Sequence, residues 1–135
     1  MNLFAIKTYS FTREERLKSK KLIETLFREG KAFSVFPYRV IYLVGGLPTP
    51  AFPVQVGFTA PSRHFPHAVD RNRIKRLGRE CWRLQKAPLY AHLRERQLQV
   101  SVFFLYTDKQ ITDYETLYKK MGQAIARLDK VLLEA

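Results

Sequence analysis

The segment from residue 62 to residue 87 constrains the fold of this chain more than any other part of the sequence. It holds eight basic residues and two acidic residues, which leaves a net charge of +6. Over 70–86, with Asp70 as the expected N-cap, the apolar residues have helical spacing and fall within an arc of roughly 80°. These residues are Ile74, Leu77, Cys81 and Leu84. A helix with one such face must cover an apolar surface, so the sequence predicts a sheet beneath it.

Four segments are typical of β-strands. The stretch 32–44 is aromatic and β-branched, and Pro37 divides it into a short edge strand and a longer strand because proline cannot donate to a central ladder. The stretch 54–60 alternates apolar and polar residues, and 98–107 is again rich in apolar residues. Two glycines and three prolines between 45 and 53 indicate a connecting loop.

The first helical region, 12–30, has two competing start signals. Thr12 and Glu15 have the spacing of a capping box, and Ser19 is a later candidate N-cap. We favour the later start, because apolar pairs then repeat at the i to i+4 spacing of one helical face. Gly30 is expected to end this helix in a left-handed conformation.

A last helix is expected to open at a capping box formed by Thr112 and Glu115, and it carries one apolar stripe. The order of elements is then α-β-β-β-α-β-α. A chain of 135 residues suits one domain. We therefore predict a single α+β domain over 1–135, with a four-stranded mixed sheet packed with three helices and a flexible segment over 1–11.

The charge of the chain points to a polyanionic partner. Lys and Arg number 24 against 12 Asp and Glu, for a net charge of +12 and a pI near 10.1. Residues 71–79 contain no acid, although a solvated helix usually alternates charges. We favour contact with nucleic acid over a solvated helix or a membrane-surface helix. Four aromatic residues are candidates for stacking on unpaired bases or for plain core packing: Phe27, Tyr38, Tyr42 and Phe103.

The sequence gives little sign of a protein-based active site. Metal-dependent phosphodiester hydrolysis needs clustered carboxylates, and the acids here are scattered. His64, His67 and Cys81 have no zinc-site spacing, so surface histidines and a buried thiol are the simpler interpretation. The single cysteine favours a reducing compartment, and we expect the cytoplasm. No apolar run reaches the roughly 18 residues of a membrane-spanning helix.

One run within the basic segment carries a family resemblance. Residues 71–80 read R-N-R-I-K-R-L-G-R-E. This resembles the signature R-N-R-I-K-R-L-x-R-E of the bacterial ribonuclease P protein component, and all nine specified positions match. The similarity extends to 11–17, 23–30 and 57–68.

This resemblance implies the protein subunit of an endonuclease that removes the 5′ leader from precursor tRNA. It implies that the RNA subunit performs the hydrolysis, with magnesium held mainly by the RNA and no cofactor intrinsic to the protein. The expected partners are the catalytic RNA and precursor tRNA, without a membrane or an obligate protein partner. The family's sheet contains a left-handed βαβ crossover. A general RNA-binding or ribosomal-type protein and a self-sufficient protein nuclease remain the alternatives.

The resemblance also assigns residues to two surfaces. By position, six residues would contact RNA: Arg71, Asn72, Arg73, Lys75, Arg76 and Arg79. Arg83 continues the same helical face and is added to this set. The cleft for the precursor-tRNA leader would be lined by Ile23, Phe27, Thr59 and Arg63, with Tyr38 as an added stacking candidate. Gly78 departs from the family, where a larger residue is usual. It either lets RNA approach closely or is simply tolerated.

Overall fold

The protein is built around a four-stranded sheet on which its helices pack. The computed structural model describes residues 9–134. The elements in chain order are a 3-10 turn η1 (Arg13–Glu15), α2 (Lys20–Glu29), β1 (Lys31–Val35), β2 (Tyr38–Val44), β3 (Val54–Thr59), α3 (Ala68–Gln85), α4 (Ala87–Arg96), β4 (Val100–Tyr106) and α5 (Tyr114–Leu133). None of the described helices is long and apolar enough to cross a membrane.

The sheet is mixed, as predicted, and its strand order is β1-β2-β4-β3. β2 pairs antiparallel with both β1 and β4, whereas β3 and β4 are parallel neighbours. The chain passes from β3 to β4 through α3 and α4, which makes this the βαβ crossover unit of the fold. The left-handed sense of the crossover stays a prediction.

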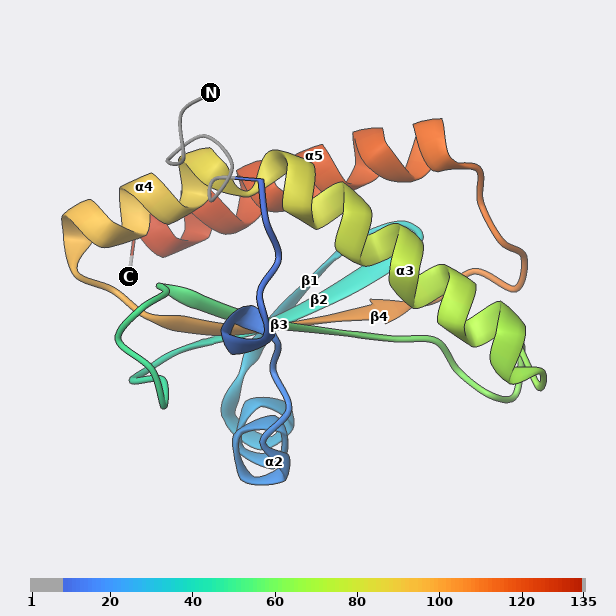
Figure 1. Cartoon of the computed structure of the whole chain (residues 1–135), viewed down its shortest axis with the longest axis horizontal. Helices are drawn as coiled ribbons and strands as arrows, with labels where there is room; N and C mark the ends of the chain where they lie inside the picture. The colour runs from blue at the N-terminus through green and yellow to red at the C-terminus, as the bar shows by residue number, and fades with distance from the viewer. Residues whose placement is uncertain (1–8, 135) are drawn as a thin grey trace.

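The two faces of the sheet are covered by different helices (Figure 1). On one face, α3 packs on β3 and α5 packs on β1, and together they enclose the larger hydrophobic core. On the other face, α2 packs on β2 and β4. The smaller cluster there contains Leu17, Leu26 and Ile41. Strand alternation places the two sets of side chains on opposite faces. On the side of α2, Ser34 and Arg39 remain exposed.

Both start signals predicted for the first helical region form capping hydrogen bonds. Ser19 is its N-cap, as predicted, and the Ser19 hydroxyl accepts from the Leu22 amide at 3.3 Å. The Thr12 amide donates to the Glu15 carboxylate at 2.7 Å, and this contact closes the separate turn η1. The expected left-handed Gly30 is wrong, because its φ is −71°. Gly30 is needed for space: a Cβ there would lie 2.4 Å from the Leu26 carbonyl oxygen.

Two predicted N-caps are also wrong. His67, not Asp70, precedes α3, and Asp70 lies inside its first turn. Asp113, not Thr112, caps α5, and its carboxylate accepts from the Thr116 amide at 3.1 Å. The Thr112 amide donates instead to the Tyr106 hydroxyl at 2.9 Å. In both places the cap depends on where the preceding loop leaves the sheet, which local sequence does not fix.

The sheet is packed with four α-helices instead of the predicted three, because α4 was missed. Lys86 both ends α3 and precedes α4, so no loop residue separates the two helices. In the sequence they resemble one helix whose apolar periodicity weakens toward its end. The available signals were Pro88 in the first turn and the spacing of Leu89 and Leu93, both of which are buried. The added helix covers one end of the larger core.

Residues 9–17 are tied to the junction of α3 and α4 by a buried ion pair between Glu15 and Lys86. The Tyr90 hydroxyl donates to the same Glu15 oxygen at 2.8 Å, and Lys86 also donates to the Ser10 carbonyl. Burial lowers the pKa of the Lys86 ammonium, against the opposing effect of the Glu15 carboxylate. Of the expected flexible segment 1–11, residues 1–8 lie outside the described residues, and Phe11 packs against the core.

We predict that Glu15→Gln lowers the free energy of unfolding by about 3 kcal/mol, because it leaves the Lys86 ammonium buried without its counter-charge. Urea denaturation measures this, and Glu24→Gln on the exposed side of α2 is the control, with a change within about 0.5 kcal/mol. Adding Lys86→Met should not destabilise the Glu15→Gln protein further. A further large loss in the double variant would contradict the ion-pair explanation.

Candidate nucleic-acid interface

The cationic side of α3 forms the first candidate surface. We define the basic face as Asn72, Arg73, Lys75, Arg76 and Arg79. Asn72, Arg73 and Arg76 are exposed, and Lys75 and Arg79 are half-buried. Among residues 9–134, no ion pair involves any of these side chains. The basic face therefore presents uncompensated positive charge to solvent, as a surface that binds phosphates does.

Two residues predicted to bind RNA have structural partners. The Arg71 guanidinium donates to the carbonyls of Phe65 and Pro66, at 2.8 Å each, and so holds the loop before α3. Arg83 donates to the Glu80 carboxylate at 2.6 and 3.1 Å and to the Tyr9 carbonyl at 2.8 Å. The hydrogen bond from Arg83 lowers the pKa of Glu80. Their contact with RNA stays a prediction, but many of their donors are already used.

Arg16 lies beside this surface, a position that the local sequence does not predict. Partial burial lowers the pKa of Arg79, and the positive charges of Arg16 and Arg76 lower it further. Arg16 is exposed and lies where the chain bridges to Val56 beside β3. In the sequence it follows two glutamates and resembles part of a solvated charge pattern. Only the docking of residues 9–17 brings it to α3.

The opposite side of α3 explains Gly78 and Cys81. A Cβ at Gly78 would lie 2.8 Å from the Phe58 ring, so this glycine lets α3 approach β3. Close approach of RNA at Gly78 is therefore wrong, because the residue is buried against the sheet. Cys81 is fully buried, and burial raises the pKa of its thiol to about 11. The thiol is a packed core group, as expected from the apolar arc.

The second candidate surface lies on the side of the sheet that α2 covers. The Phe27 and Phe103 rings meet edge to face with centroids 5.3 Å apart, and 47% of Phe27 is exposed. The Phe103 ring lies over Gly57, where a Cβ would be 2.7 Å from it. We call Phe27 and Phe103 the aromatic surface. An exposed ring supported by a second ring is suited to stacking on an unpaired base.

Two other predicted leader-cleft residues lie on the side of the sheet that α2 covers. Ile23 packs against the small cluster under α2, and Thr59 ends β3 on the same side, in register with Leu105. Arg63 is exposed in the turn that follows β3. Ile23 and Thr59 therefore lie on the same side of the sheet as the aromatic surface, and contact of these residues and Arg63 with a leader stays a prediction.

Tyr38 is wrong as a residue of that surface. Its ring lies on the opposite face of the sheet, 5.5 Å from Phe104 and 5.9 Å from Tyr106, and it is 2% exposed. Burial raises the pKa of its hydroxyl above the usual range. Tyr42 faces the same core and packs on Phe33, with centroids 6.0 Å apart. The sequence shows that a strand alternates, but it does not show which side each set of residues takes.

A metal-binding group is not formed by the described residues. No three His, Cys, Asp or Glu side chains within 9–134 lie close enough together to hold a metal ion. His64 and His67 belong to the loop before α3, and Cys81 is enclosed in the core. His64, His67 and Cys81, the three residues weighed as zinc ligands, are thus not brought together.

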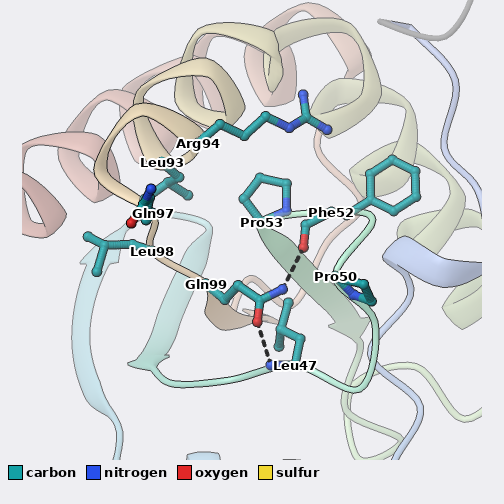
Figure 2. A pocket seen from close by; sticks show the side chains of 9 residues that line it. All are labelled: Leu47, Pro50, Phe52, Pro53, Leu93, Arg94, Gln97, Leu98 and Gln99. Atoms are coloured by element: carbon teal, nitrogen blue, oxygen red, sulfur yellow. Dashed lines mark hydrogen bonds between the residues drawn. The ribbon is translucent and has the colours of Figure 1, made fainter.

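The loop 45–53, which the sequence left without a role, forms a hollow of about 440 Å³ with the end of α4 (Figure 2). Gln99 holds the loop in place. Its side-chain oxygen accepts from the Leu47 amide at 2.9 Å, and its amide nitrogen donates to the Thr49 and Phe52 carbonyls at 2.8 and 3.1 Å. None of the residues that line this hollow belongs to the basic face or the aromatic surface.

Comparison with known proteins agrees over nearly the whole chain. The family model described as Ribonuclease P matches residues 11–129. A protein of Porphyromonas gingivalis named Ribonuclease P protein component is 37% identical over 121 residues, which cover 90% of this chain and 88% of the relative. A protein of the same name from Chlorobium phaeobacteroides is 30% identical over 123 residues, or 84% of each chain.

Solved structures show the same fold. The RNase P protein of Staphylococcus aureus superposes with a TM-score of 0.64 at 18% identity, covering 87% of this chain and 96% of that one. The RNase P protein from Thermotoga maritima gives a TM-score of 0.62 at 20% identity, covering 84% and 96%.

Proposed function

Because the chain belongs to the ribonuclease P protein family, we propose that it is the protein subunit of ribonuclease P and binds two different stretches of RNA. The basic face of α3 would bind the catalytic RNA subunit. The surface beside α2 would bind the 5′ leader of precursor tRNA. The observation that carries this proposal is the separation of two surfaces on opposite sides of one sheet: a basic face without ion pairs among the described residues, and an exposed aromatic surface.

The chemistry of the two surfaces supports this division. A cationic helix neutralises the phosphates of a folded RNA without reading its sequence. An exposed ring can stack on any base, which suits leaders of different sequences. A ribosomal-type RNA-binding protein would need the basic face alone, so the aromatic surface favours the subunit role.

In this proposal the protein supplies binding and the RNA supplies the chemistry. Within 9–134 no three His, Cys, Asp or Glu side chains gather around one point, and we propose that the RNA holds the magnesium and carries out the hydrolysis. The lone cysteine is consistent with the cytoplasm, where we place the complex.

The central experiment is cleavage of precursor tRNA by the protein, by the RNA subunit and by the reconstituted complex. We expect no cleavage by the protein alone. Changing any single acid to its amide should leave the chemical step of the complex within a few-fold of normal, measured by single-turnover kinetics. An amide variant that folds and assembles but abolishes cleavage would support a protein-based nuclease.

The basic face is tested by Arg76→Ala and Arg79→Ala. Each should weaken binding to the RNA subunit and make log affinity depend less steeply on log salt, because one phosphate contact is lost. Lys130→Ala on α5 removes the same charge elsewhere and should change neither quantity. If the Arg76 and Arg79 variants bind like the Lys130 variant, the catalytic RNA does not use this face.

The aromatic surface is tested by Phe27→Ala in the reconstituted complex. Stacking is worth about 1 to 3 kcal/mol per base, so precursor tRNA should bind roughly tenfold more weakly. Mature tRNA has no leader and should bind as before. Competition binding measures both, after circular dichroism has confirmed folding. Equal losses for precursor and mature tRNA would show that Phe27 supports the fold or the RNA interface instead.

A further inference from the structure

Two exposed tyrosines at the start of α5 border a hollow that the proposed function does not use. The rings of Tyr114 and Tyr118 have centroids 6.0 Å apart, and their planes are inclined by 40°. Tyr114 is 40% exposed and Tyr118 is 38% exposed. With Glu115 and Lys119 they line a hollow of about 280 Å³, which we call the tyrosine hollow. Two exposed rings side by side offer apolar area that a flat ligand can cover.

The tyrosine hollow lies beside the helix that carries the basic face. α3 and α5 pack against each other on one side of the sheet (Figure 1). Partial burial raises the pKa of the Tyr114 hydroxyl, the charge of Glu80 raises it further and the charge of Arg83 lowers it, so these α3 side chains lie close to Tyr114. Arg83 is about one turn beyond Arg79 of the basic face. An RNA bound along the basic face can therefore reach the tyrosine hollow.

The two charged residues of the tyrosine hollow are not paired with each other. Glu115 precedes Lys119 by one helical turn, the order that favours an ion pair on a helix. Within the described part of the chain, however, neither side chain takes part in an ion pair. The carboxylates nearby are engaged, because Asp113 caps α5 and Glu80 accepts from Arg83. Glu115 thus places an acceptor at the rim of a hollow lined by two rings.

These groups are suited to recognising an unpaired nucleobase. Any base can stack on an exposed ring through its flat face. A carboxylate only accepts hydrogen bonds, so it selects bases that present an amino group, which are adenine, cytosine and guanine. The Lys119 ammonium can meet an adjoining phosphate. A second copy of this chain is a poorer occupant, because each copy carries a net charge of +12.

We propose that the tyrosine hollow binds one unpaired base of the catalytic RNA and that Glu115 selects a base with an amino group. This inference rests on the proposed function of the basic face. The basic face binds phosphates and does not read sequence, whereas the tyrosine hollow reads one base. The protein thus contacts the catalytic RNA through both α3 and α5, and the contact at α5 depends on the identity of a nucleotide.

The first test is the affinity of the protein for the catalytic RNA over a range of salt concentrations. Tyr118→Leu should weaken binding about tenfold, because a stacking ring is lost, and Tyr118→Phe should bind like the unsubstituted protein. In contrast to Arg76→Ala, Tyr118→Leu should leave the slope of log affinity against log salt unchanged, because no phosphate contact is lost. Glu115→Gln should weaken binding about threefold although it removes a negative charge. The control Glu95→Gln on α4 removes the same charge from an exposed position and should not weaken binding.

Chemical probing of the catalytic RNA, with every protein at a saturating concentration, identifies the base. One unpaired adenine, cytosine or guanine should be protected by the unsubstituted protein and by Arg76→Ala. The same base should be reactive with Tyr118→Leu and with Glu115→Gln. A protected base that is uracil, or a protection that survives both substitutions, would contradict the inference.

The outcomes separate this inference from the proposed function. If Arg76→Ala changes neither the affinity nor its salt dependence, the catalytic RNA does not use the basic face, and the inference is wrong with it. If Arg76→Ala behaves as expected while Tyr118→Leu and Glu115→Gln bind normally, only the inference is wrong. If Tyr118→Leu lowers the midpoint of thermal unfolding, Tyr114→Leu takes its place with the same expected loss. A dimer of the free protein in sedimentation that Tyr118→Leu dissociates would assign the tyrosine hollow to self-association and overturn the inference.

Discussion

The buried ion pair between Glu15 and Lys86 is the contact on which the two candidate surfaces depend. It fixes residues 9–17 against the junction of α3 and α4, and from there the chain runs beside β3 into α2. This path brings Arg16 to the basic face and Leu17 to the cluster under α2. An ion pair has defined geometry when it is buried, so it selects one docking position where apolar contact alone would allow several.

The sheet keeps two different binding chemistries apart. The basic face carries like charges that repel one another, and α3 tolerates them because its other side packs on β3 and α5. The aromatic surface needs apolar support, which the cluster around Leu26 and Ile41 supplies from below. Had both surfaces shared one side, the cations would lie against the apolar cluster and lose hydration. In the proposed function, this separation lets each surface bind its own stretch of RNA.

Two glycines set how closely the layers approach. Gly78 lets α3 lie against the Phe58 ring, and Gly57 lets the Phe103 ring lie close to β3 on the other face. Phe58 in turn stacks on Phe104, with ring centroids 5.2 Å apart, in the middle of the larger core. Each glycine lowers the intrinsic stability of its helix or strand, and the aromatic packing that the glycine permits offsets this cost. The position of the aromatic surface thus follows from packing around β3.

Elements whose pattern is local and strong can be predicted from the amino-acid sequence alone. Helical and strand periodicity predict the apolar and basic sides of α3, the Ser19 cap and the alternation of the strands. The run 71–80 identified the family. Packing between distant elements sets which face of the sheet each alternating set of strand side chains occupies. Phe27 and Tyr38 were equal candidates until α2 covered one side of the sheet and α3 and α5 covered the other. Such packing also brings Arg16 to the basic face. It gives Arg71 backbone carbonyl partners, and it gives Arg83 a carboxylate and a backbone carbonyl partner. These outcomes depend on contacts between residues far apart in the chain, and periodicity along the chain carries no information about them.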